Sequence, residues 1–189
     1  MKPCVFLDRD GVINRLIIER GPRETPCRPA EFTLLPGVPE ALASLKQAGF
    51  LLVVVTNQPN VAKGKSTWED YLAIETRMHE LLTPGADVDS VFACLHHPNP
   101  KQVVVRQYLA QCECRKPKPG LLYAAASELG IDLGSAWLVG DSYTDLKAGI
   151  RAGLAEERLI LISNRKKSDS VSAASLREAA KHIIKHPNT

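Results

Sequence analysis

The chain has 189 residues, of which 44% are hydrophobic and 24% are charged, and this is ordinary for one globular domain with a sizeable core. The longest apolar run, residues 50–55, is far too short to span a membrane, so we expect no membrane partner. A net charge of +3 and an aromatic content of 5% are too low for a typical nucleic-acid-binding surface, so we expect no nucleic-acid partner.

Short apolar segments alternate with amphipathic ones along the chain. The apolar runs predict strands at residues 4–7, 51–55, 90–94, 137–139 and 159–162. Helical patterns cover residues 38–47, 67–82, 121–129, 143–152 and 173–184, and long irregular stretches occupy residues 8–36 and 96–119. Strands that alternate with helices imply right-handed crossovers and a parallel sheet covered on both faces. We therefore predict a three-layer, Rossmann-like α/β fold in a single domain, with its active site outside the carboxyl ends of the strands.

The first predicted strand ends in two acidic residues, Asp8 and Asp10, followed by Gly11. Residues two apart on an extended strand point to the same side, so both carboxylates could face one cavity, and Gly11 lets the chain turn sharply after them. Close carboxylates repel each other unless they share a proton or a cation. The pair therefore suits Mg²⁺, with one carboxylate oxygen left as a nucleophile, although a solvated acidic loop would have the same sequence.

The second predicted strand runs into Thr56-Asn57-Gln58, and the fourth ends in Gly140-Asp141-Ser142, with Asp145 shortly after. A hydroxyl and two amides suit phosphate oxygens, although the same three residues could simply cap a turn. Asp141 and Asp145 form a second acidic pair at a second strand end. Because the carboxyl ends of parallel strands lie at one edge of a sheet, these groups are expected near Asp8.

A basic segment, Arg115-Lys116, precedes the helix predicted at residues 121–129. Cations before a helix N-terminus oppose the helix dipole unless an anion lies between them. The segment therefore favours a phosphate-binding role, with a solvated basic linker as the alternative.

The five cysteines are an odd number, and Met1-Lys2-Pro3 leads straight into the first strand without room for a signal peptide. This argues against a disulfide framework, and we expect a cytoplasmic protein. Cys94 with His96, and Cys112 with Cys114, can supply a closed tetrahedral Cys₃His set for a structural Zn²⁺. The adjacent His97 is an alternative ligand; we favour His96 because Cys-x-His mirrors Cys-x-Cys. Redox-active thiols are the other interpretation, for which Cys-x-Cys is an atypical spacing.

Together these motifs resemble the haloacid dehalogenase superfamily of aspartyl-phosphate-forming phosphatases, from Asp8 to about Asp145. Within it, the segments 8–14, 55–58, 94–98 and 112–120 look like those of the D,D-heptose 1,7-bisphosphate 7-phosphatases. The zinc loop, about residues 94–116, is shared closely with the histidinol-phosphate phosphatases, which remain the alternative. The resemblance implies a haloacid dehalogenase fold and a small phosphorylated sugar as the substrate. The chain has no long insertion after Asp8, or between Thr56 and Lys116, so we expect no large cap domain, a pocket shaped by loops, and a monomer.

Carried over residue by residue, the resemblance implies that Asp8 is the nucleophile and that Asp10 first protonates the leaving oxygen and then deprotonates water. It also implies that Thr56 and Lys116 hold the phosphoryl oxygens, and that Arg115, with Asn57 and Gln58, contacts the substrate. The implied Mg²⁺ ligands are Asp8, Asp10 through its main-chain carbonyl, and Asp141, with Asp145 bracing the site. The implied zinc ligands are Cys94, His96, Cys112 and Cys114.

Two loops depart from the pattern of these phosphatases. A Gly-Tyr-Val-like stretch usually follows the first motif, whereas this chain has Glu19-Arg20-Gly21-Pro22-Arg23, with Arg28 beyond. Pro59-Asn60 stands where a Ser-Gly pair is usual. The arginines could bind a second phosphate or be surface charges. A zinc-stapled binding module without catalysis is the remaining hypothesis, and it predicts that Asp8 and Asp10 are replaceable without consequence.

Overall fold

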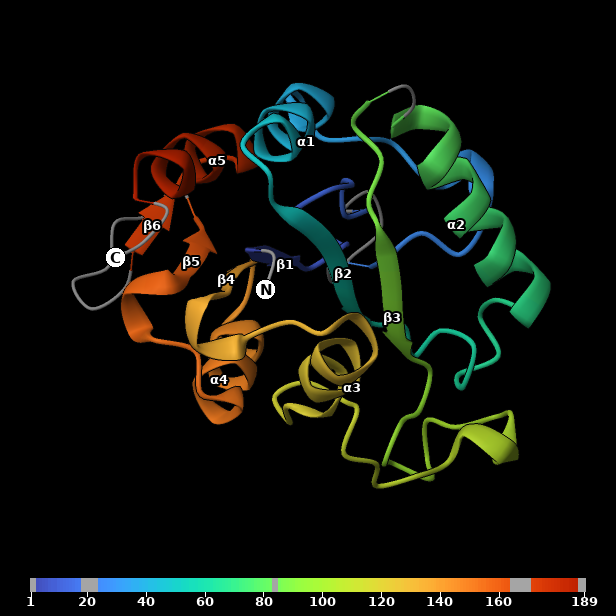
Figure 1. The fold of residues 1–189 in the computed structure, drawn as a ribbon. Helices are drawn as coiled ribbons and strands as arrows, with labels where there is room; N and C mark the ends of the chain where they lie inside the picture. Colours follow the sequence, from blue (N-terminus) through green and yellow to red (C-terminus); the bar gives the residue numbers. More distant parts are fainter. Residues whose placement is uncertain (1–2, 18–23, 83–84, 164–170, 187–189) are drawn as a thin grey trace.

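The structure, a computed structural model, describes residues 3–17, 24–82, 85–163 and 171–186 (Figure 1). The described residues form a six-stranded parallel sheet in the order β3-β2-β1-β4-β5-β6, which places β1 between β2 and β4. The strands are β1 (Cys4–Leu7), β2 (Leu51–Asn57), β3 (Ser90–Cys94), β4 (Trp137–Gly140), β5 (Leu159–Ile162) and β6 (Val171–Ala173). The helices are α1 (Val38–Gln47), α2 (Trp68–Leu82), α3 (Gly120–Leu129), α4 (Tyr143–Ala152) and α5 (Leu176–Lys185). The predicted parallel α/β sheet is confirmed.

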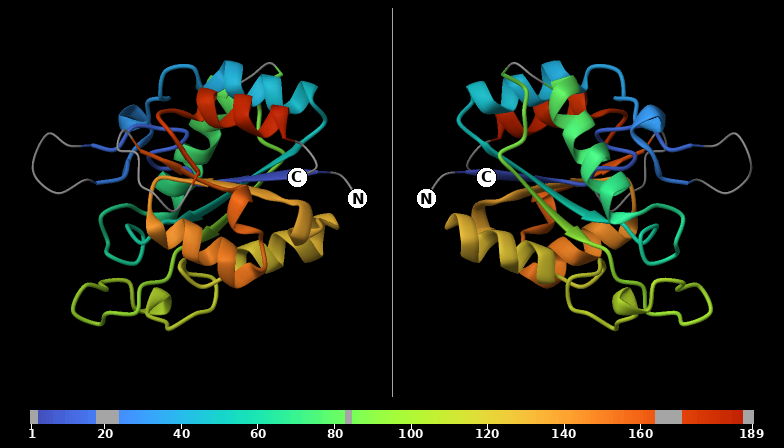
Figure 2. Two further views of the ribbon diagram at one scale, coloured as in Figure 1. Left: turned by 90° about the vertical axis from the view of Figure 1, so that its left-hand side faces the viewer. Right: turned by 90° about the vertical axis from the view of Figure 1, so that its right-hand side faces the viewer.

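The alternation of side chains along β1 builds a separate core on each face of the sheet. Val5 and Leu7 pack in one cluster with residues of α1, α2 and α5, whereas Cys4 and Phe6 pack in a second cluster with residues of α3 and α4. Figure 2 shows these two helical layers above and below the sheet. Each fully buried aliphatic or aromatic side chain contributes about 1.5–3 kcal/mol, so the central strand is stabilised from both sides.

The ends of two helices show how local sequence sets their limits. At the start of α2, the Thr67 N–H donates to Asp70 Oδ2 (2.9 Å) and the Asp70 N–H donates to Thr67 Oγ1 (3.0 Å), a reciprocal cap. The last helix begins at Leu176 rather than at residue 173 as predicted, because Ser175 caps it by accepting from the Glu178 N–H. Residues 171–173 instead pair with β5 as the short strand β6, which the sequence pattern did not predict.

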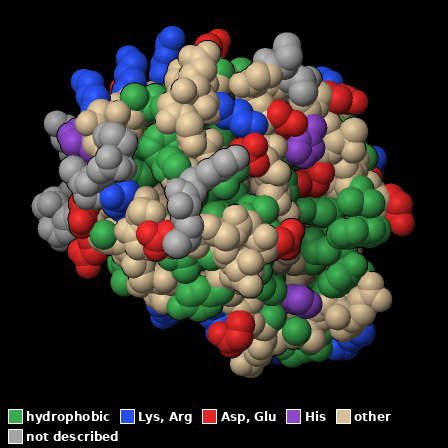
Figure 3. Space-filling model, in the orientation of Figure 1, with side chains coloured by type: hydrophobic (Ala, Val, Ile, Leu, Met, Phe, Trp, Pro, Cys, Tyr) green, Lys and Arg blue, Asp and Glu red, His purple; other side chains and the backbone are tan. Residues whose placement is uncertain are grey.

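The segment that joins β3 to α3 lies beside α3, outside the helical layers, and contains the short 3-10 helix Arg106–Tyr108 (lower right in Figure 1). None of the helices in the described ranges is long and apolar enough to cross a bilayer. On the face drawn in Figure 3, Lys and Arg side chains gather along the upper left edge, and Asp and Glu side chains are spread over the rest.

Candidate active site

Three strands end at one edge of the sheet and carry the predicted polar residues there. Asp8 directly follows the central strand β1, Thr56 lies near the end of β2, and Asp141 directly follows β4. The Asp8 N–H donates to the Val139 carbonyl at 2.9 Å, which ties the end of β1 to β4. Because β1 lies between the other two strands, Asp8 stands between the threonine and the second aspartate.

Four charged side chains meet at this edge. Ligand oxygens of Asp8, Asp141 and Asp145 all lie within 4.8 Å of one another. The Lys116 Nζ lies 2.9 Å from Asp8 Oδ1 and 2.5 Å from Asp145 Oδ1, and it donates to the Val55 carbonyl at 2.8 Å. The predicted carboxylates and lysine are therefore neighbours in space, although they come from distant parts of the chain.

The electrostatics of this cluster favour a bound cation. Burial raises the pKa of Asp8 to about 7; the Lys116 ammonium opposes this rise, and the Asp145 and Asp10 carboxylates add to it. Burial also lowers the pKa of Lys116, but the Asp8 and Asp145 carboxylates outweigh burial and raise it, so the side chain stays charged. Three carboxylates around one ammonium carry excess negative charge, and oxygen ligands of this kind fit Mg²⁺.

Gly11 allows the loop after β1 to approach Asp141. Its φ is +85°, and a Cβ atom at this position would lie 2.3 Å from Asp141 Oδ2. A larger residue would collide with that carboxylate and would also be strained by the positive φ. The glycine thus sets the distance between the first and second acidic motifs.

The Asp10 carboxylate is held by three donors from separate positions. Asn14 Nδ2 donates to Oδ1 (3.0 Å), Gln58 Nε2 donates to Oδ2 (2.5 Å), and the Arg9 guanidinium lies 3.3 Å from both oxygens. Gln58 Nε2 also donates to Thr56 Oγ1 at 2.9 Å. Because this amide donates to the threonine oxygen, the Thr56 hydroxyl hydrogen is available for another acceptor.

Asn57 contacts the backbone of Lys116. Its Oδ1 accepts from the Lys116 N–H at 3.0 Å and its Nδ2 donates to the Lys116 carbonyl at 3.1 Å. The Asn57 amide therefore joins the end of β2 to the basic loop.

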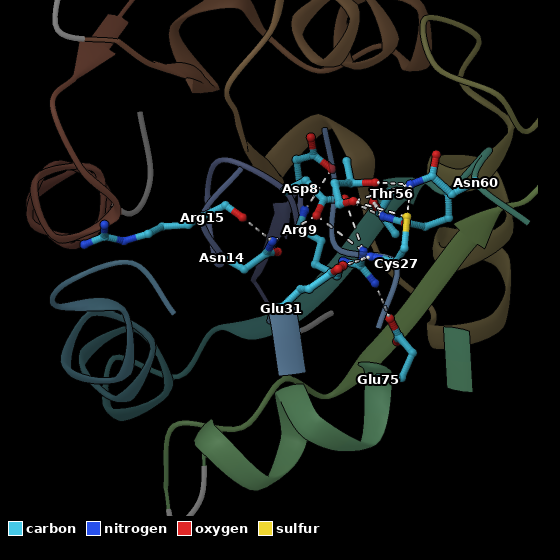
Figure 4. Close-up of polar contacts among 12 residues, drawn as sticks. Asp8, Arg9, Asn14, Arg15, Cys27, Glu31, Thr56, Asn60 and Glu75 are labelled. Carbon is cyan, nitrogen blue, oxygen red and sulfur yellow. Dashed lines mark hydrogen bonds and ion pairs between the residues drawn. The ribbon is translucent and has the colours of Figure 1, made fainter. Parts of the chain in front are cut away.

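A buried arginine and a glutamate join the site without having been predicted. Arg9 is fully buried and its Nη1 lies 3.1 Å from Glu75 Oε1 on α2 (Figure 4). Continued alternation would point Arg9 away from Asp8 and Asp10, but β1 ends at Leu7 and the Arg9 guanidinium reaches Asp10. In the sequence, the only indication of this ion pair is that Arg9 lies between two aspartates, because Glu75 is 66 residues away.

The predicted soft ligands also come together. The three Sγ atoms of Cys94, Cys112 and Cys114 are 3.2 to 3.6 Å apart, and His96 Nδ1 lies 3.4 Å from the sulfur of Cys114. A tetrahedral zinc with Zn–S bonds of about 2.3 Å has sulfur–sulfur edges of about 3.8 Å, so the four atoms could hold such an ion. His97 lies outside this Cys/His cluster, where its Nδ1 accepts from the Asn99 N–H.

The remaining predicted residues lie around these two centres. The Arg115 guanidinium donates to the His96 carbonyl at 3.2 Å, and burial with the charges of Arg115 and Lys63 lowers the pKa of His97. Of the second-phosphate candidates, Arg28 is exposed, whereas Arg20 and Arg23 lie outside the described residues.

A cavity of about 780 Å³ opens beside the acidic cluster, between the end of β5, the start of α5 and the segment before α1. Gly11 and Asp141 belong to its wall, but most of the other lining side chains are apolar, such as Leu35, Leu161 and Leu176. The groups that could bind a phosphoryl group lie next to this cavity rather than around it.

Comparisons with known proteins agree with this geometry. The family model of the haloacid dehalogenase-like hydrolases matches residues 22–153. The D-glycero-beta-D-manno-heptose-1,7-bisphosphate 7-phosphatase of Yersinia pestis is 38% identical over 160 residues, 84% of this chain and 80% of that protein. The protein with the same name in Vibrio cholerae serotype O1 is 38% identical over 84% of this chain and 81% of its own length.

The sheet and its flanking helices match a solved structure over nearly their whole length. The crystal structure of D,D-heptose 1,7-bisphosphate phosphatase from B. bronchiseptica, complexed with magnesium and phosphate, superposes with a TM-score of 0.78 and 30% identity. The match covers 98% of this chain and 99% of that one. The chain therefore belongs to the haloacid dehalogenase-like hydrolases.

Proposed function

We propose that this protein is a Mg²⁺-dependent phosphatase that removes the C7 phosphate of D-glycero-D-manno-heptose 1,7-bisphosphate through an aspartyl-phosphate intermediate. The observation that carries the proposal is the convergence of Asp8, Lys116 and Asp145 with Asp141 at one edge of the sheet. The relatives at 38% identity that are named for this reaction support the choice of substrate.

In the first step, an Asp8 carboxylate oxygen attacks phosphorus, and the bond between phosphorus and the sugar oxygen breaks. Asp10 gives its proton to that leaving oxygen, so the sugar departs as an alcohol rather than as an alkoxide. The Thr56 hydroxyl donates to a phosphoryl oxygen, since its own oxygen already accepts from Gln58. The Lys116 ammonium donates to the Val55 carbonyl and lies at ion-pair distance from Asp8 and Asp145, so it binds a phosphoryl oxygen from a position held by these three contacts.

In the second step, water attacks the phosphorus of the aspartyl phosphate and gives a proton to Asp10. The bond between phosphorus and the Asp8 oxygen breaks, so inorganic phosphate leaves, Asp8 is again a carboxylate and Asp10 is again protonated. Asp8, Asp141 and the main-chain carbonyl of Asp10 would hold Mg²⁺. When bound there, the ion would neutralise the charge on the phosphoryl group. Asp145 holds Lys116 and accepts from Ser142, so it braces the site. We assign to Asn57 the role of positioning the main chain of Lys116. Arg115 and the outer face of Gln58 are the groups that we place nearest the substrate.

We further propose that Cys94, His96, Cys112 and Cys114 bind a structural zinc that has no open position for catalysis. Zinc would anchor the loop at residues 94–116, which carries Arg115 and Lys116. We propose one domain over residues 1–189 that acts as a monomer. Thiolate ligands stay reduced in the cytoplasm, which supports that location.

A phosphate-release panel tests the reaction. The zinc-loaded protein with Mg²⁺ should release phosphate from both anomers of the heptose bisphosphate faster than from histidinol phosphate. Asp8→Asn should abolish release, and Lys116→Met should lower it by at least about 100-fold, since removing a comparable transition-state contact costs this much. Lys118→Met is the matched control, because the Lys118 side chain is 40% exposed and pairs with Glu113 at 2.8 Å. No hydrolysis of any phosphomonoester by the folded, metal-loaded protein would refute the proposal, and faster release from histidinol phosphate would reassign the substrate.

A further inference from the structure

We propose that Glu75, on helix α2, is a positioning residue for the Asp10 carboxyl group and acts through the buried guanidinium of Arg9. The inference rests on the proposed function, in which Asp10 transfers the proton to the leaving oxygen. It extends the site from the sheet edge to a helix that carries none of the reacting groups.

The geometry makes Arg9 a bridge between the helix and the catalytic motif. Its Nη1 lies 3.1 Å from Glu75 Oε1, and its Nη2 lies 3.3 Å from both oxygens of Asp10. Figure 4 shows the Arg9 guanidinium between the end of β1 and the Glu75 side chain on α2. The guanidinium carbon lies over the Phe32 ring, 5.9 Å from the ring centroid.

The contacts of Arg9 with Glu75 and with Asp10 differ in length. Arg9 is fully buried, and its charge must be met by partners because water does not reach it. The contact to Glu75 is the shorter one, whereas Asp10 is held more closely by Asn14 (3.0 Å) and Gln58 (2.5 Å). Glu75 thus draws the guanidinium toward α2 and leaves the Asp10 carboxyl group in the position set by the two amides.

Loss of the Glu75 charge would leave Asp10 as the nearest carboxylate to the buried guanidinium. The guanidinium would then shift toward Asp10 and form closer, forked hydrogen bonds, as arginine does with carboxylates. Such bonds would turn the Asp10 oxygens away from the leaving oxygen. The expected defect is therefore in proton transfer to the leaving group, not in the attack of Asp8 on phosphorus.

Substrates with different leaving groups distinguish a defect in proton transfer from a defect in the attack of Asp8. An alkyl phosphate such as the heptose bisphosphate needs a proton on its leaving oxygen, whereas 4-nitrophenyl phosphate or acetyl phosphate releases a stable anion without one. The quantity to measure is kcat/KM, which reports events up to formation of the aspartyl phosphate. Glu75→Gln should lower kcat/KM for the sugar phosphate by at least about tenfold, part of the 100- to 10,000-fold that general-acid catalysis contributes, and should change it by less than about threefold for the activated phosphate.

The same substitution elsewhere on the helix is the matched control. Glu69→Gln lies in the first turn of α2, is exposed and has no contact with Arg9, so it should leave both kcat/KM values unchanged. In an Asp10→Asn background, Glu75→Gln should have no further selective effect, since both variants act on one proton transfer. Glu75→Asp, which keeps the charge, should restore part of the loss.

The outcomes distinguish the inference from the function on which it rests. Equal losses on the two substrates, or no loss on either, would overturn the positioning role. If Glu75→Gln does not fold, the same comparison with Glu75→Asp decides: a selective loss on the sugar phosphate supports the role, and an equal loss or none overturns it. Absence of hydrolysis by the wild-type protein would instead refute the proposed function.

Discussion

The side chain of Asn57 binds both main-chain polar groups of Lys116, with its Oδ1 3.0 Å from the Lys116 nitrogen and its Nδ2 3.1 Å from the Lys116 oxygen. These two bonds link the end of β2 to the loop that brings the ammonium to Asp8. The position of Lys116 is therefore fixed by an amide at the end of β2 as well as by its own ion pairs.

Replacing this amide should displace the lysine. Asn57→Asp keeps the shape and the acceptor but places a carboxylate oxygen against the Lys116 carbonyl, where a donor stood. We expect the free energy of unfolding to fall by about 1–3 kcal/mol, the cost of leaving a buried polar group unpaired. We also expect kcat/KM to fall by about tenfold, equivalent to about 1.4 kcal/mol of transition-state stabilisation. Denaturant unfolding and phosphate release would measure the two effects.

Asn99→Asp is the matched control for this substitution. The Asn99 Oδ1 accepts from the Lys101 N–H at 2.9 Å, a contact that aspartate keeps. The control should change neither stability nor activity by more than a small amount. If both variants behave alike, the clamp on Lys116 has no role in placing the lysine.

Sequence patterns predicted the strand ends well because both alternation and strand length are local properties. Asp8, Thr56 and Asp141 end neighbouring strands of one parallel sheet, so their meeting follows from the topology alone. The Cys/His cluster could also be predicted, because its two pairs, Cys94 with His96 and Cys112 with Cys114, each have a characteristic spacing. These features could be predicted because each is encoded within a few residues.

The supporting contacts could not be predicted in this way. Asn57 and Gln58 were expected to face phosphate, but which side of each amide is free depends on partners 59 and 48 residues away. The pairing of Arg9 with Glu75 depends on how α2 lies against the sheet, because the two residues are 66 positions apart. Such contacts follow from packing, which a single sequence does not specify.

The stability of the Mg²⁺-free protein should depend on Asp8 between about pH 4 and pH 7. Burial raises the pKa of Asp8 to about 7, above the value of about 3.9 in an unfolded chain. Over this interval the folded state binds more protons than the unfolded state, so the stabilisation that Asp8 provides when protonated is lost as the pH rises. Wild-type protein should therefore lose more stability between pH 5 and pH 8 than Asp8→Asn does.

Denaturant unfolding of the zinc-loaded protein in Mg²⁺-free buffer at the two pH values would measure this difference. Added Mg²⁺ should reduce it, because a bound cation favours the ionised carboxylate. Equal pH dependence of the wild type and Asp8→Asn would show that Asp8 ionises in its ordinary range.

Removal of the predicted zinc should impair catalysis indirectly. Cys112→Ser takes one ligand from the Cys/His cluster, and the loop that carries Arg115 and Lys116 then loses its anchor. We expect the zinc content to fall well below one ion per chain and the loop to become more accessible to proteases, with lower activity as a consequence. Elemental analysis and limited proteolysis would measure the first two effects.

Cys27→Ser is the control for the zinc prediction. Cys27 lies outside the Cys/His cluster, where its thiol accepts from Asn60 Nδ2 at 3.2 Å, so the variant should keep its zinc. Native protein purified without chelators that contains no zinc would contradict the prediction.

Gly11 and Gly49 allow a direct test of how the two acidic motifs are spaced. Both have a positive φ, +85° and +89°, so alanine at either position carries a similar backbone strain of about 1 kcal/mol. A Cβ at Gly49 would meet nothing within 4 Å, whereas a Cβ at Gly11 would lie 2.3 Å from Asp141 Oδ2. The difference between the two alanine variants therefore isolates the collision with Asp141.

Gly11→Ala should push Asp141 away from Asp8 and open the cation site. We expect Mg²⁺ affinity and kcat/KM to fall by at least about tenfold, since a displaced ligand weakens both binding and charge neutralisation. Gly49→Ala should lose only the stability that corresponds to its backbone strain, and it should bind Mg²⁺ as the wild type does. Calorimetric titration with Mg²⁺ compares the two variants directly. If Gly11→Ala binds Mg²⁺ as tightly as Gly49→Ala, Asp141 is not a ligand of that ion, because a ligand carboxylate could not be displaced without a loss of affinity.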